Sequence, residues 1–153
     1  MVRVRSRRIL TGLSASVRVG TVHRTMTDTP ETLAEKWGIP VVDVRLQDGL
    51  AGCKDGRTIW VDDRLTTVER HCTIAHELVH IDAGHTGHQS PKVEAWVRRR
   101  TAAWLLGRVD VVHALRTHPT VWDAAEHLGV TVPVLRDQLA ALEYQGAHDA
   151  HGH

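Results

Sequence analysis

The chain has 153 residues, 42% of them hydrophobic and 24% charged, with a formal net charge of +1, as expected for one globular domain with a buried core. No apolar stretch reaches the roughly 18 residues that a membrane-spanning helix needs, and two cysteines are too few for a disulfide framework. There is no phenylalanine, so we expect the five tryptophans and the aliphatic residues to fill the interior, while an excess of 12 histidines suggests metal binding or pH sensing.

The N-terminal stretch differs in charge from the rest of the chain. Residues 1–25 hold six arginines and no acid, which leaves residues 26–153 with 13 basic and 18 acidic groups, a net charge of −5. This stretch lacks periodicity, and we expect a disordered basic extension. Its run Ser6-Arg7-Arg8-Ile9-Leu10 loosely matches a twin-arginine export signal, but polar residues and glycine interrupt the apolar segment that should follow. We therefore expect a cytoplasmic protein, with export as the alternative.

The first half of the domain predicts one short helix and a small sheet. The sequence Thr29-Pro30-Glu31 pairs an N-cap hydroxyl with a proline at the first helical position, and the helix should run to Trp37. Segments 40–46, 50–53 and 58–61 read as strands, the last two joined through Asp55-Gly56, a favoured hairpin pair. We expect them to form a small antiparallel sheet.

The second half predicts a run of helices. Thr66-Thr67-Val68-Glu69 has capping-box spacing and begins a helix that ends near Gly84; its apolar residues lie on nearly every side, which indicates burial. Further helices are predicted from Ser90-Pro91 to Gly107, in a short segment after Asp110, and over 120–128 and 131–145. A small sheet followed by a run of helices predicts an α+β fold. We expect the folded domain at 26–146 and a polar, histidine-containing tail at 147–153.

The segment His76-Glu77-Leu78-Val79-His80 has the H-E-x-x-H pattern. Helical residues four apart project from one face, so both imidazoles can reach a single metal ion. Glu77 can then act as the catalytic base on a water molecule in an open metal position, where zinc lowers the pKa of water toward neutrality. The pattern predicts a catalytic Zn²⁺ site, and the alternative is a pair of hydrogen-bonded core histidines.

The third metal ligand must come from downstream. The metzincin pattern requires glycine and histidine where this chain has Ala83 and Thr86, so that class is excluded. His85 and His88 miss the spacing, and we expect them to be solvent-exposed, with an influence on the site as the alternative. Glu94, in the first turn of the next helix, is better placed if that helix returns antiparallel, giving a gluzincin-like His₂Glu set. Its alternative role is favourable interaction with the helix dipole.

The region around the H-E-x-x-H motif resembles a known protein family. The segment 73–80, followed by Glu94-Ala95 and by the apolar run 102–106, resembles the ImmA/IrrE family of metallo-endopeptidases over about residues 29–145. The resemblance implies a zincin-like fold, with His76, His80 and Glu94 as zinc ligands and Glu77 as the base. It also implies cleavage of a helix-turn-helix repressor of a phage or mobile element. Strand 57–62 would bind an extended peptide if it lay at a sheet edge, but we expect it inside the sheet.

Two other functions are considered. Residues 124–136 resemble a DNA-binding helix-turn-helix, but residues 120–146 hold four acidic side chains against Arg136, so direct nucleic-acid binding is disfavoured. The second alternative is a non-catalytic zinc-binding domain in which Cys72 joins His76 and His80. The helical drift of about 40° per four residues carries Cys72 away from His80 and disfavours that site.

Overall fold

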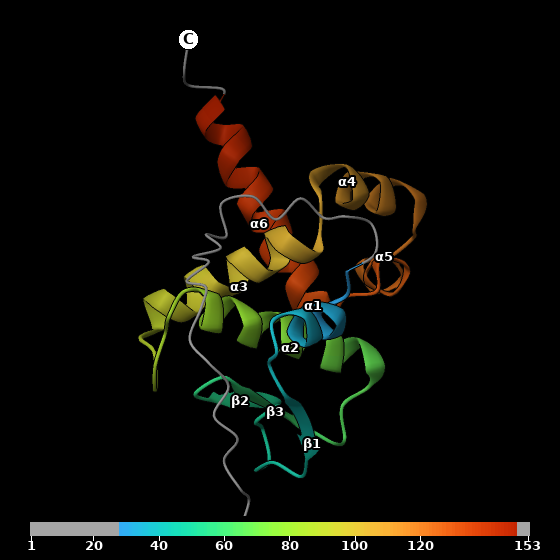
Figure 1. Cartoon of the computed structure of the whole chain (residues 1–153). Helices are drawn as coiled ribbons and strands as arrows, with labels where there is room; N and C mark the ends of the chain where they lie inside the picture. Colours follow the sequence, from blue (N-terminus) through green and yellow to red (C-terminus); the bar gives the residue numbers. More distant parts are fainter. Residues whose placement is uncertain (1–27, 150–153) are drawn as a thin grey trace, which may run out of the picture.

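The computed structural model describes residues 28–149, and the predicted basic extension at 1–25 lies outside these residues. The described chain folds into α1 (Pro30–Lys36), β1 (Val41–Val44), β2 (Gly52–Asp55), β3 (Thr58–Asp62), α2 (Thr67–Asp82), α3 (Pro91–Leu105), α4 (Arg108–Thr117), α5 (Val121–Leu128) and α6 (Val132–Asp149) (Figure 1). The α+β class is therefore confirmed. Among the described residues, no helix has the length and apolar character to cross a membrane.

Local capping explains where the helices begin. Thr29 Oγ1 accepts a hydrogen bond from the Thr32 backbone N–H at the start of α1. At the start of α2, Thr66 and Glu69 form the predicted reciprocal capping box, in which each side chain accepts from the other residue's backbone N–H. Ser90 caps α3 ahead of the proline at its first position. These helix starts agree with the sequence prediction.

The sheet is mixed, so the prediction of an antiparallel sheet is wrong. The strand order is β1-β3-β2; β3 pairs antiparallel with β2 through the hairpin and parallel with β1. In the central strand β3, Ile59 and Val61 are completely buried, whereas β2 carries the polar Lys54 and Asp55. The most buried strand lies in the centre, where both of its edges are paired and one face packs on α2. As expected, β3 lies inside the sheet.

Two helix boundaries also differ from the prediction. Helix α4 already begins at Arg108, and α6 continues through Gly146 to Asp149, so the start of the expected polar tail is helical. A glycine costs a helix only about 1 kcal/mol relative to alanine. At Gly146 that cost is too small to end a helix whose preceding turns pack against α3, α4 and α5.

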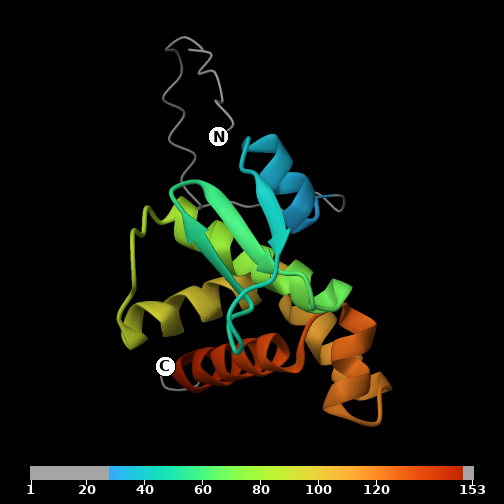
Figure 2. The ribbon, with the colours of Figure 1, turned by 90° about the horizontal axis from the view of Figure 1, so that it is seen from below.

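Helix α2 lies between the sheet on one side and helices α3 to α6 on the other (Figures 1 and 2). Its Ile74 and Leu78 join the cluster shared with α1 and the sheet, and its Cys72 joins the cluster formed with α4, α5 and α6. The predicted burial of this helix is confirmed. The tryptophan prediction is wrong in part: Trp37 and Trp104 are half-buried against the cluster of α1 and the sheet, whereas Trp96 and Trp122 are exposed. The fully buried core consists mainly of isoleucine, valine, leucine and alanine.

A buried carboxylate fixes the turn after the sheet. The side chain of Asp62 is only 3% exposed and accepts hydrogen bonds from the backbone N–H groups of Leu46 and Arg64 and from the Arg64 guanidinium. The hydrogen bonds from the Arg64 side chain are the main reason why the pKa of Asp62 lies well below its ordinary value, although burial opposes this shift. The network joins the end of β3 to the chain after β1.

Replacing Asp62 by asparagine should lower the melting temperature at pH 7 by about 5 °C or more, because an amide NH₂ would replace one of the two carboxylate oxygens that accept these hydrogen bonds. The stabilisation by the native carboxylate is fully present above its unfolded pKa of 3.8 and is lost as the pH falls below that value toward the folded pKa. The difference between wild type and Asp62→Asn should therefore shrink in thermal melts below about pH 4. Asp55→Asn, at an exposed position, is the control, and an unchanged difference at pH 3 would contradict the ionic role.

Candidate metal centre

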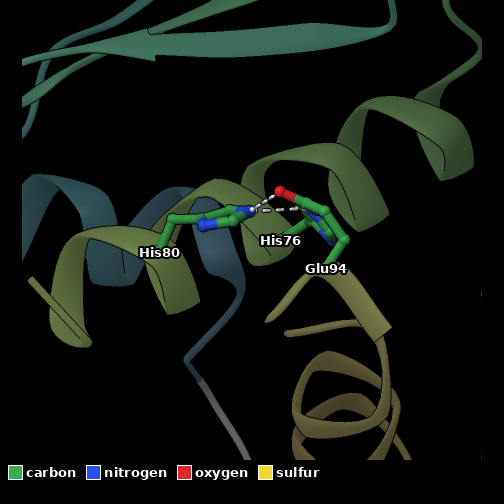
Figure 3. Close-up of side chains that lie close together, drawn as sticks. All are labelled: His76, His80 and Glu94. Atoms are coloured by element: carbon green, nitrogen blue, oxygen red, sulfur yellow. Dashed lines mark hydrogen bonds and ion pairs between the residues drawn. The ribbon is translucent and has the colours of Figure 1, made fainter. Parts of the chain in front are cut away.

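The two histidines of the motif lie one turn apart on α2, and their Nε2 atoms are 3.1 Å from each other. His80 is almost completely buried and His76 is half-buried. Helix α3 packs against α2 and brings Glu94, in its first turn, to this pair. One carboxylate oxygen lies 3.4 Å from His76 Nε2 and the other lies 3.4 Å from His80 Nε2 (Figure 3). The antiparallel return that was predicted for Glu94 is present.

The spacing of these atoms suits one metal ion. Ligand atoms about 2.1 Å from a tetrahedral zinc lie about 3.4 Å from one another, and the three separations here are 3.1, 3.4 and 3.4 Å. Within residues 28–149, one group of side chains has its ligand atoms close enough together to hold a metal ion: His76, His80 and Glu94. These atoms all lie within 4.8 Å of one another. Cys72 does not belong to this group, which removes the geometric basis of a site with a cysteine ligand.

The protonation states of the histidines also favour metal binding. Burial lowers the pKa of His76 and of His80 below the ordinary histidine value, and for His80 the neighbouring His76 lowers the pKa further. The negative charge of Glu94 raises both pKa values, but this offsets only part of the decrease. The imidazoles are therefore neutral near pH 7. A neutral imidazole has a free lone pair on one ring nitrogen, which is the form that binds a metal ion.

Glu77 has the environment of a group that exchanges protons near neutral pH. It is buried on α2, and burial, together with the negative charge of Glu94, raises its pKa to about 7, while Lys54 acts in the opposite direction. A carboxyl group with a pKa near the working pH is suited to general acid–base catalysis. The predicted catalytic residue therefore lies beside the three candidate ligands in a setting that favours this role.

The candidate site opens into a cavity of about 800 Å³. Its walls come from the sheet, from α2 and α3, and from the beginning of α6; they include Leu50–Lys54, His76, Glu77, His80, Glu94, Arg98, Thr131, Pro133, Val134 and Asp137. Arg98 and Asp137, 3.7 Å apart, join the α3 and α6 walls. The first turns of α6 thus line this cavity; they belong to the segment that resembles a DNA-binding helix-turn-helix in sequence.

Strand β2 forms one wall of the cavity and has an unpaired edge, since β3 is its single partner in the described sheet. A β-carbon at Gly52 would collide with the methyl group of Thr73 on α2 and lie 3.1 Å from the Trp60 carbonyl oxygen. Glycine therefore allows this strand to approach the motif helix closely. The close approach holds a free strand edge next to the candidate metal centre.

His85 lies in contact with the candidate site, which agrees with the predicted alternative and not with the favoured expectation of solvent exposure. This residue is half-buried, and its Nδ1 lies 3.0 Å from His80 Nδ1, so the expectation of a solvent-exposed side chain is wrong. His88, in the same loop, is exposed as expected. His85 comes five residues after His80, outside the helix, and no helical periodicity predicts such a contact; it depends on the path of the loop.

Comparisons of this chain with family models, with curated proteins and with solved structures found no match.

Proposed function

We propose that this chain is a zinc-dependent endopeptidase with a zincin-like site that hydrolyses a peptide bond in a protein substrate. The observation that carries this proposal is the convergence of two imidazole nitrogens and a carboxylate within 4.8 Å on the wall of a large cavity. Two histidines and one glutamate are a ligand set used by catalytic zinc, which keeps a fourth position open. The buried Glu77 beside them supplies the proton acceptor that peptide hydrolysis requires.

The proposed mechanism assigns each residue one task. His76, His80 and Glu94 would hold the ion, and bound Zn²⁺ supplies Lewis-acid polarisation of a carbonyl and a lower pKa for water. Glu77 accepts a proton from the attacking water as the new C–O bond forms. It then donates this proton to the leaving amine as the C–N bond breaks, which restores the carboxylate.

We assign the binding of the substrate backbone to β2. Segment 57–62 could have served this role only at a sheet edge, and both edges of β3 are paired, as expected. The free edge of β2 borders the cavity, and an extended peptide can add to such an edge through main-chain hydrogen bonds. This arrangement would hold the scissile bond next to Glu77 and would favour unfolded or flexible segments of a protein substrate.

The substrate class comes from the family resemblance of the motif region, which points to a helix-turn-helix repressor. Zinc-loaded protein should therefore cut such a repressor, encoded beside its own gene, into fragments whose masses add up to the intact repressor plus one water. Mass spectrometry of the reaction would detect the products. Treatment with 1,10-phenanthroline should abolish cleavage and added Zn²⁺ should restore it, whereas repressors that stay intact would contradict this substrate class.

Direct DNA binding is the weaker candidate. The helix pair α5–α6 has the left-handed Gly129 of a tight interhelical turn, but a DNA-binding helix-turn-helix must present the first turns of its second helix to the major groove. In this chain Pro133, Val134 and Asp137 of those turns line the cavity beside the candidate ligands. The acidic balance of the segment adds repulsion from phosphate.

A further inference from the structure

We infer that His85 is a positioning residue of the metal centre: it accepts a hydrogen bond from His80 and thereby holds His80 in the tautomer and orientation that bind the ion. The inference rests on the proposed zinc site. It adds a residue that lies outside the H-E-x-x-H motif and outside the three candidate ligands.

The two ring nitrogens of His80 have different partners: one faces the candidate metal ligands and the other faces His85. Its Nε2 faces His76 and Glu94, at 3.1 and 3.4 Å, and its Nδ1 lies 3.0 Å from His85 Nδ1. To bind a cation through Nε2, a neutral His80 must carry its proton on Nδ1. That N–H then donates to His85 Nδ1, whose own proton must be on Nε2. A partner that accepts from the distal ring nitrogen of a ligand histidine fixes its tautomer and raises its basicity.

His85 is itself held in place from several sides. Its backbone N–H donates to the His80 carbonyl oxygen at 3.0 Å, and its own carbonyl oxygen accepts from Lys54 Nζ of β2. Its ring packs edge-to-face on Trp96 of α3, with a centroid separation of 5.9 Å. The residue thus connects the loop after α2 to the strand and to the helix that carries Glu94. A side chain fixed in this way can orient the ring that it contacts.

Three variants test the inference through zinc affinity, measured by competition with a chromophoric chelator. His85→Leu fills the space against Trp96 with an apolar side chain that has no hydrogen-bond acceptor. The dissociation constant of this variant for Zn²⁺ should rise about 10- to 100-fold. His85→Asn can place an amide oxygen where Nδ1 was and should restore most of the affinity. His113→Leu makes the same histidine-to-leucine substitution at an exposed position on α4, outside the cavity wall, and should bind zinc as the wild type does.

The outcomes separate this inference from the proposed function. A wild-type protein that fails to bind zinc would overturn both. Stoichiometric binding by the wild type with equal affinity in His85→Leu would overturn the role of His85 alone, and so would an equal loss in His85→Leu and His85→Asn. Circular dichroism checks that each variant is folded, and His85→Ala replaces the leucine variant if that protein does not fold.

Discussion

Glu77→Gln should reduce the rate of substrate cleavage by about 10²- to 10⁴-fold, the contribution typical of a general base, while the protein still binds one zinc ion. The amide has the shape of the carboxylate but does not take up a proton from water. Because His76, His80 and Glu94 keep their positions, metal affinity should change little. Cleavage rates measured with the same repressor, together with zinc content measured by atomic absorption, provide the test.

The matched control for this substitution is Glu143→Gln, which makes the same chemical change at an exposed position on α6. It should keep both the cleavage rate and the zinc content of the wild type. A Glu77→Gln protein that cleaves at the wild-type rate would contradict the assigned role of Glu77. Loss of zinc together with loss of activity would instead indicate that Glu77 supports the metal site.

Glu94→Ala should lower zinc affinity by more than about 100-fold, beyond the range typical of residues that only orient ligands. Two histidines would remain, and the ion would lose the one negatively charged ligand of the set. For the wild type, free zinc at about 1,000 times its dissociation constant should stabilise the folded state by about 4 kcal/mol. At the same free zinc a site weakened 100-fold would gain only about 1.4 kcal/mol. Melting curves with and without zinc should therefore show a large shift for the wild type and at most about a third of that stabilisation for Glu94→Ala.

The same melts distinguish ligation from a helix-dipole role, because Glu94 lies in the first turn of α3, where a negative charge is favourable. If the dipole were its sole role, Glu94→Ala would lower the melting temperature equally with and without zinc, and the zinc-induced shift would survive. That result would contradict ligation. Glu143→Ala, far along α6, should leave the shift unchanged.

Much of the secondary structure could be predicted because its signals are local. The N-caps at Thr29, Thr66 and Ser90 each depend on a hydroxyl and a backbone N–H three residues away, and such short-range contacts are visible in the sequence. The same holds for the pairing of His76 and His80, since four residues make about one helical turn. Helix ends were predicted less well: Gly146 was expected to end a helix that in fact continues.

The order of the strands could not be predicted because it depends on which strand is buried most. The hairpin signal between β2 and β3 is local, but the parallel pairing of β1 with β3 joins segments separated by the whole of β2. It follows from packing the apolar face of β3 on α2. Tryptophan burial was wrongly expected for a related reason: composition shows how many large side chains exist, and packing decides where they lie.

The amino-acid order was enough to identify the helix that carries the candidate site, the two histidines on one of its faces and the neighbouring carboxyl of Glu77, because helical periodicity relates residues that are close in the chain. It also singled out Glu94 as the downstream acid at a helix start. Three features became visible only in the folded chain: Glu94 reaches both histidines, the free edge of β2 borders the cavity, and His85 contacts His80. These contacts depend on how α3, the sheet and the loop pack around α2, and the physical reason is that side chains from separate elements meet only when the core is formed.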